Sequence, residues 1–213
     1  MDRVNERDIK ETIDEIKDIA PKMVLTDYTK LKRNIQELKR DEMRKMDASS
    51  VIGVENFIKD EKLEKFFNED IARKTLYLSG RSGIGKTEYV KTKMVEKAGA
   101  EAVIRVTDKE GLKVLDGTEK AIIMDDINLD NLSAEELLGL FDVCNNHDQR
   151  ILYGTALLRK GVYRAVISNK TIHEAIRNRN FPQAQIEAIL RRIFEVDLKG
   201  KVLKLTLELR EEK

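Results

Sequence analysis

The sequence predicts an α/β fold in which a mainly parallel sheet carries helices on both faces, preceded by a small N-terminal helical hairpin. From residue 51 onward, apolar residues alternate between the spacing of helices and the spacing of strands. Strands that alternate with helices along a chain form parallel sheets covered on both faces. Before residue 48, apolar residues recur only at helical spacing, and charged residues are much denser.

The N-terminal segment, residues 1–47, is expected to be a helical oligomerisation segment. It holds 12 basic and 12 acidic residues, so about half of it is charged. Apolar residues recur three or four positions apart in two runs, over 9–16 and 24–38, and Pro21 separates the runs. A hairpin this short cannot bury both apolar seams by itself. It packs either on the main domain or on other subunits.

The main domain is expected over 51–213, after a linker of sequence Asp-Ala-Ser-Ser at 47–50. Short apolar runs predict strands over 75–79, 102–106, 121–124, 163–168, 193–198 and 202–209. Helical spacing of apolar residues predicts helices over 54–67, 87–98, 133–143, 171–178 and 183–190.

The composition is that of a globular intracellular protein. Of 213 residues, 41% are hydrophobic and 37% charged, and the net charge is +1, whereas a disordered chain combines low hydrophobicity with high net charge. No apolar run approaches the roughly 18 residues of a membrane span, and the first residues lack a signal segment. The single Cys144 excludes an intramolecular disulfide, and its surroundings favour a packed cysteine over a reactive one.

A phosphate-binding loop follows the strand expected at 75–79. Residues 80–87 read Gly-Arg-Ser-Gly-Ile-Gly-Lys-Thr, the complete G-x-x-x-x-G-K-[ST] pattern, and a helical stretch follows. Backbone amides of such a loop surround a phosphate, while Lys86 reaches the β- and γ-phosphates and the Thr87 hydroxyl binds Mg²⁺. The motif predicts ATP and Mg²⁺ as cofactors. The expected nucleotide contacts are Gly80, Ser82, Gly83, Ile84, Gly85, Lys86, Thr87 and Glu88.

Two carboxylates end the apolar strand at 121–124. Asp125 would hold Mg²⁺ through water, and Asp126 would orient or polarise the attacking water. Acids after an apolar strand can be ordinary turn residues. Their position about 40 residues after the phosphate loop, at the carboxyl edge of the expected sheet, favours the catalytic interpretation.

The strand at 163–168 ends in Asn169. In NTPases with a strand inserted between those that carry the phosphate loop and the acids, the tip of that strand faces the γ-phosphate. Asn169 would then position the attacking water and sense hydrolysis. Asparagine at a strand end is also a common turn former, but its place after the other two motifs favours the sensing role.

Together these motifs resemble those of superfamily 3 helicases, the ATPase domains of replication initiators (Rep proteins) of small DNA viruses and related plasmids. The resemblance covers roughly residues 55–198 and rests on Gly80–Thr87, Asp125-Asp126, Ile167–Asn169 and Ile189–Phe194. It implies an AAA+-like P-loop ATPase that forms a homo-oligomeric ring, typically hexameric, and moves along single-stranded DNA. It also implies a cytoplasmic location in a bacterium, or the host nucleus for a eukaryotic virus.

In that family an arginine just past the Asn strand reaches the γ-phosphate held by the neighbouring subunit. Arg192 resembles this finger, with Arg191 as the alternative, and Arg177 and Arg179 compete for the role. A guanidinium supplied in trans neutralises charge that builds on the phosphoryl oxygens. An Arg-Arg pair before a strand could also be a simple surface pair.

The family also carries a basic hairpin between the acid pair and the Asn strand, which grips single-stranded DNA. The candidates in this interval are Arg150, Tyr153, Arg159 and Lys160. Cationic side chains would follow the phosphates and the tyrosine would stack on a base. Tyr153 stands where many relatives have lysine, so the chain departs from the family at the DNA-gripping position. An ordinary basic turn would have a similar composition.

The family's nickase motif is absent, because the only histidines are His147 and His173 and no His-x-His pair exists. Any nickase would be a separate domain or protein partner. Two other interpretations remain open: an AAA+ loader or adaptor that binds ATP and a partner protein without unwinding DNA, and an oligomeric module that binds nucleotide only structurally.

The net charge of +1 conceals two opposite regions. Residues 107–143 hold 3 basic and 10 acidic residues, a net charge of −7, and include the acid pair. Residues 145–192 hold 9 basic and 3 acidic residues, a net charge of +6. The basic region runs from the candidate hairpin to the candidate finger, where phosphates of DNA and of a neighbour's ATP would be met.

Overall fold

The computed structural model describes residues 6–20, 28–32, 34–35, 51–69, 73–152, 154–177 and 179–204. The chain divides into two compact units between Lys45 and Met46. The linker predicted at 47–50 lies outside the described residues.

The first unit contains helix α1 (Glu6–Ile19), and residues 28–32 and 34–35 are also helical. Ile13 from α1 is buried together with Leu31 and Ile35 from the second stretch. The two predicted apolar seams therefore contact each other, one from each side of Pro21.

The second unit is built on a five-stranded parallel sheet of order β2-β3-β6-β1-β7. Its strands are β1 (Thr75–Ser79), β2 (Val103–Val106), β3 (Ala121–Asp125), β6 (Tyr163–Ser168) and β7 (Ile193–Asp197). The predicted α/β class is confirmed. Strand β6 lies between β1 and β3, which is the insertion on which the expected role of Asn169 depends.

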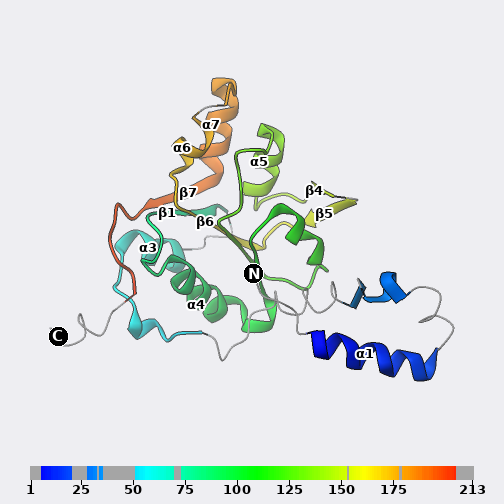
Figure 1. Ribbon diagram of the computed structural model, residues 1–213. Helices are drawn as coiled ribbons and strands as arrows, with labels where there is room; N and C mark the ends of the chain where they lie inside the picture. The colour runs from blue at the N-terminus through cyan, green and yellow to red at the C-terminus, as the bar shows by residue number, and fades with distance from the viewer. Residues whose placement is uncertain are drawn as a thin grey trace. The chain divides into compact units, whose positions relative to one another are not determined.

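Helices cover both faces of this sheet, as Figure 1 shows. Helices α3 (Glu61–Asn68) and α4 (Lys86–Ala98) lie on one face, and α5 (Ala134–Phe141), α6 (Ile172–Ile176) and α7 (Gln183–Arg192) lie on the other. Successive residues of a strand point to opposite faces. Accordingly Leu76 and Leu78 pack with the α3–α4 layer, while Tyr77 between them packs with the α5–α7 layer.

Short elements connect these layers. The described part of this unit contains three 3-10 helices, η2 (Val54–Asn56), η3 (Ala100–Ala102) and η4 (Lys109–Val114). Between α5 and β6 the chain forms an antiparallel hairpin of β4 (His147–Ile151) and β5 (Gly154–Leu158). The hairpin therefore occupies the interval in which the family resemblance implied one.

The structure corrects two predicted elements. A single helix over 54–67 was wrong, because α3 begins only after Asp60, whose carboxylate accepts hydrogen bonds from the amides of Lys62 and Leu63. A side-chain oxygen that satisfies the first free amides in this way starts a helix. In the predicted strand over 202–209, the described part contains only an isolated bridge between Lys204 and Phe57.

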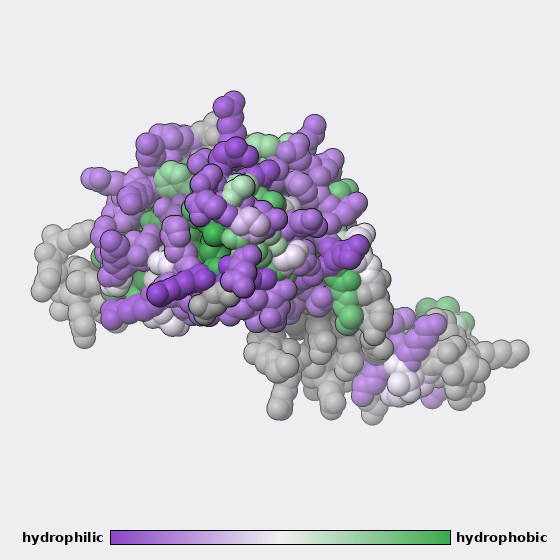
Figure 2. Space-filling model, turned by 90° about the horizontal axis from the view of Figure 1, so that it is seen from above, coloured by the Kyte–Doolittle hydropathy of each residue, from purple (hydrophilic) through white to green (hydrophobic). Residues whose placement is uncertain are grey.

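The face shown in Figure 2 is mostly hydrophilic, in keeping with the 37% content of charged residues. In Figure 2, hydrophobic residues on the face in view gather mainly in a hollow near its middle. Cys144 is exposed, so the expectation of a packed cysteine was wrong, since this residue lies in the loop after α5. None of the helices in the described part of the chain combines the length and the apolar character that a membrane crossing requires.

Candidate nucleotide-binding site

The phosphate loop joins the end of β1 to the start of α4 at the carboxyl edge of the sheet. Gly85, the residue before α4, has a φ of 90°, a backbone conformation that side chains disfavour. A Cβ atom there would lie 2.7 Å from Cβ and 2.9 Å from the backbone nitrogen of Lys204. Glycine is therefore required both by the loop conformation and by the close approach of the C-terminal segment.

Lys86 lies inside this loop. Its Nζ donates hydrogen bonds to the carbonyl oxygens of Gly80 (2.5 Å) and Arg81 (2.9 Å) and to Oδ1 of Asn169 (3.0 Å). Burial lowers the pKa of Lys86, although the charges of Asp126 and Asp125 oppose that shift. The ammonium group is thus held among oxygen acceptors, where phosphate oxygens could replace carbonyl oxygens.

Asp125, at the end of β3, is buried and joins two other elements. Its Oδ1 accepts a hydrogen bond from the Thr87 hydroxyl of α4 at 3.1 Å. Its Oδ2 accepts from Nε and a terminal nitrogen of Arg105 on β2 at 2.9 and 2.6 Å. The predicted pair of Mg²⁺-binding residues is therefore in direct contact, and the second carboxylate oxygen is held by an arginine.

Arg105 was missed in the sequence analysis. It is the one charged residue in the apolar run Val103-Ile-Arg-Val106, and β2 lies beside the strand that carries the acids. Its side chain is 43% exposed on this edge strand, so burial alone does not require a partner for it. A charged residue in an apolar run could have marked Arg105 for attention, but only the strand order identifies Asp125 as its partner.

Asp126 and Asn169 face each other across β3 and β6. Asp126 has a φ of 52°, unusual for a residue with a side chain, and its amide donates to the carbonyl of Ile167 at 2.9 Å. Nδ2 of Asn169 lies 3.3 Å from Oδ1 of Asp126, while its Oδ1 accepts from Lys86. Asn169 thus links the lysine of the phosphate loop to the second acid of the acid pair.

These groups surround a cavity of about 290 Å³. Its lining comprises Ser82, Gly83, Gly85, Lys86, Thr87, Glu88, Asp125, Asp126, Ile167, Asn169 and Lys204. The donors and the hydroxyl–carboxylate pair suit a phosphate chain with Mg²⁺, which takes few protein ligands and keeps several waters. Lys204 was not predicted, because it reaches the loop from the far end of the chain.

Two predicted nucleotide contacts lie outside this lining. Ile84 is 2% exposed and packs in the core, and its carbonyl accepts hydrogen bonds from the amides of Leu203 and Lys204. The carbonyl of Gly80 accepts a hydrogen bond from Lys86. Both residues shape the loop in this structure.

The candidate arginine finger lies at the opposite edge of the sheet. Ile193, the residue after Arg192, pairs with Thr75 at the start of β1, whereas the phosphate loop follows the end of β1. Arg192 therefore cannot serve the phosphate loop of its own chain. Nε of Arg192 lies 3.3 Å from Oδ2 of Asp142 and its NH1 group donates to the carbonyl of Ala188 at 2.9 Å.

The other candidate arginines differ in their surroundings. Arg191 and Arg177 are exposed. Arg179 donates to the carbonyl of Leu129 at 2.7 Å and lies over the ring of Phe181, 4.6 Å from its centre. Arg179 is therefore engaged within its own chain.

The candidate DNA-binding residues lie on and after the β4–β5 hairpin. Arg150 on β4 and Lys160 after β5 are exposed. Arg159 donates a hydrogen bond to the carbonyl of Gly117, so its guanidinium already has a partner within the domain. Tyr153 lies outside the described residues.

Comparisons with known proteins concern the fold alone. The chain matches no protein-family model, and no curated protein matches its sequence. The crystal structure of a candidate primosome component from Streptococcus pyogenes serotype M3 is similar, with 18% sequence identity and a TM-score of 0.44. The likeness covers 70% of this chain and 86% of that one. NtrX from Brucella abortus, solved with ATP and with ADP, is similar at 12% and 13% identity, each with a TM-score of 0.40. The likeness to NtrX covers 84% of this chain and 45% of NtrX.

Proposed function

We propose that this protein is an ATP-dependent, ring-forming DNA helicase or translocase that acts in the replication of a virus, plasmid or mobile element. The main observation behind this proposal is a series of hydrogen bonds that runs from Lys86 through Asn169 to Asp126. The contact of Thr87 with Asp125 lies beside it. Together these contacts unite all three predicted motifs at one edge of the sheet. The order of strands β1, β6 and β3 puts Asn169 between the loop and the acids.

Each of these residues has a separate role in ATP hydrolysis. Lys86 binds the β- and γ-phosphates, and Thr87 and Asp125 hold Mg²⁺. When bound, Mg²⁺ neutralises charge on the phosphate oxygens. Asp126 orients the attacking water and accepts its proton through Oδ1 or Oδ2, and Asn169 fixes Asp126 by the contact already described.

A neighbouring subunit completes the site in this proposal. Arg192 lies at the far edge of its own sheet, so it serves the nucleotide of an adjacent copy in a head-to-tail ring, which we propose is hexameric. Single-stranded DNA binds to the basic hairpin through exposed residues such as Arg150 and Lys160. Any nicking activity belongs to a separate protein or domain.

ATPase measurements at increasing protein concentration test the shared site. Turnover per subunit should rise steeply with concentration, because an isolated chain lacks a partner's arginine. Lys86→Ala should abolish turnover at every concentration, and Arg192→Ala should remove most of it while ATP still binds. An active monomer whose rate ignores Arg192→Ala would contradict the shared site.

Strand displacement on forked DNA separates the proposed helicase from its rivals. Displacement that requires ATP and is lost in Lys86→Ala supports the helicase. Robust ATP hydrolysis without displacement points to a loader or adaptor that acts on a partner protein. Tight ATP binding without turnover points to a structural nucleotide site.

A further inference from the structure

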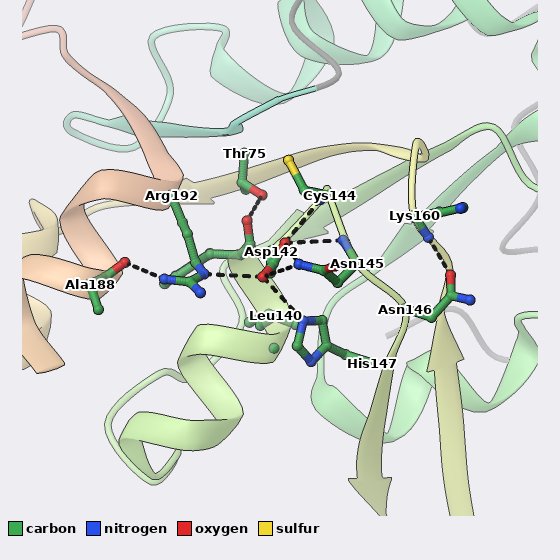
Figure 3. A network of polar contacts seen from close by, with 12 residues as sticks. Thr75, Leu140, Asp142, Cys144, Asn145, Asn146, His147, Lys160, Ala188 and Arg192 are labelled. Atoms are coloured by element: carbon green, nitrogen blue, oxygen red, sulfur yellow. Dashed lines mark hydrogen bonds and ion pairs between the residues drawn. The ribbon is translucent and has the colours of Figure 1, made fainter.

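Asp142, the residue after α5, is the centre of a polar network at the edge of the sheet opposite the phosphate loop (Figure 3). The residue is only 5% exposed. Its Oδ1 accepts hydrogen bonds from the amides of Cys144 (2.9 Å) and Asn145 (3.2 Å), and the Asn145 side chain donates to both carboxylate oxygens. The carboxylate is therefore fixed in position by its own loop.

This fixed carboxylate holds Arg192. Asp142 accepts a hydrogen bond from Nε, and the carbonyl of Ala188 accepts one from NH1, so the guanidinium is held at two points. Its remaining N–H groups make no hydrogen bond with any residue in the described part of the chain. A guanidinium held at two points is fixed in orientation, and its remaining N–H groups can donate to a phosphate.

The same carboxylate also contacts the base of the β4–β5 hairpin. Nε2 of His147, the first residue of β4, lies 3.3 Å from Oδ2 of Asp142. Figure 3 shows His147 and Arg192 approaching Asp142 from different elements. Asp142 thus joins the end of α7 to the start of the hairpin.

Asp142 stays charged in this setting. Burial by itself would raise the pKa of Asp142, but hydrogen bonds from Asn145, the Cys144 amide and Arg192, together with the nearby His147 ring, lower it to about 2. A charged carboxylate is a stronger acceptor for a guanidinium than a neutral one.

We infer that Asp142 is a positioning residue that orients Arg192 toward the nucleotide of the neighbouring subunit. The inference rests on the proposed function, since it assumes that Arg192 acts in trans. It differs from a purely structural role in one respect. An Asp142 variant lacks a competent finger but keeps a competent phosphate loop, so a neighbour with a normal Asp142 can restore its activity.

Subunit mixing uses this difference. Asp142→Asn should lower kcat about 10- to 100-fold with little change in KM for ATP, as expected when a catalytic group loses its orientation. Mixed in equal amounts with Lys86→Ala, which cannot hydrolyse ATP but carries a normal Arg192, it should recover activity. Random assembly pairs a quarter of all sites correctly, so about a quarter of the wild-type rate is expected.

A second variant keeps the experiment informative if Asp142→Asn fails to fold. Asn145 is exposed, and its side-chain amide donates hydrogen bonds to Asp142 and makes none with Arg192 in the network of Figure 3. Asn145→Ala should fold normally and lower kcat several-fold, with recovery in the same mixing experiment. Asn146→Ala is the matched control, because its side chain contacts the amide of Lys160 and not Asp142; it should keep the wild-type rate.

The outcomes separate this inference from the proposed function. If Lys86→Ala restores Arg192→Ala but neither Asp142→Asn nor Asn145→Ala, then Asp142 does not act through Arg192 and the inference is overturned. If Lys86→Ala fails to restore even Arg192→Ala, the shared site itself is wrong. Recovery of all three variants supports both.

Discussion

Replacing Arg164 with methionine should destabilise the second unit by about 3–5 kcal/mol, because four backbone carbonyls lose a buried hydrogen-bond donor. Arg164 is fully buried on the central strand β6. Its NH1 group donates to the carbonyls of Gly139 and Leu140, both at 3.1 Å, and of Asp142 at 2.9 Å. Its NH2 group donates to the carbonyl of Arg159 at 2.9 Å.

The magnitude follows from what methionine cannot replace. Two of these carbonyls, Gly139 and Leu140, belong to the last turn of α5, where no further helical amide is available. Leaving four acceptors without this donor costs about 1 kcal/mol or more each. Burial also lowers the pKa of Arg164 to about 10, so removing the charge recovers some desolvation energy and offsets part of the loss.

Urea unfolding followed by far-ultraviolet circular dichroism measures this change, since the chain has no tryptophan. Arg191→Met on the exposed end of α7 is the control and should alter stability by less than about 0.5 kcal/mol. A loss below about 1 kcal/mol for Arg164→Met would refute the reasoning, because it would mean that water or backbone relaxation satisfies those carbonyls equally well.

Three further results are expected. Gly85→Ala should cost about 1–3 kcal/mol of stability and weaken ATP binding, because residue 85 has a φ of 90° and the new Cβ would clash with Lys204. Gly154→Ala is the control and should be neutral, because there is open space around the new Cβ. Urea unfolding and ATP titration measure the two variants. Asp126→Asn should lower kcat about 10²- to 10⁴-fold with ATP affinity retained, because a general base is lost and the phosphate contacts remain. Steady-state kinetics measure this, and a rise in KM without the fall in kcat would contradict it. The pKa of Asp142 in the folded protein, about 2, lies below its value in the unfolded chain. The charged carboxylate therefore stabilises the fold above about pH 4, and this stabilisation is lost as the pH falls toward 2. The stability difference between wild type and Asp142→Asn should shrink by about 2 kcal/mol over that range, and a constant difference would contradict the shift.

Local chemistry explains what could be predicted. The strands at 75–79 and 163–168 have the predicted bounds, because a buried parallel strand is a short apolar run with polar residues at its end. The phosphate loop is equally local, since its glycines and lysine are consecutive. The helix expected over 54–67 failed because one carboxylate, Asp60, starts α3 later than apolar spacing alone suggests.

Contacts across the sheet could not be predicted from such patterns. Arg105 meets Asp125 only because β2 and β3 are neighbours, and Lys204 reaches the loop from the other end of the chain. Asp142 resembles an ordinary residue after a helix until its contacts with Arg192 and His147 are seen.

By itself, the sequence determined the α/β class, the phosphate loop and the identity of the acids and the asparagine, because these depend on the spacing of neighbouring residues. Tertiary structure alone decided that Asn169 links Lys86 to Asp126, and that Arg192 lies at the edge remote from its own phosphate loop. The physical reason is that periodicity is a property of short segments. Strand order and register instead bring together side chains that are far apart along the chain.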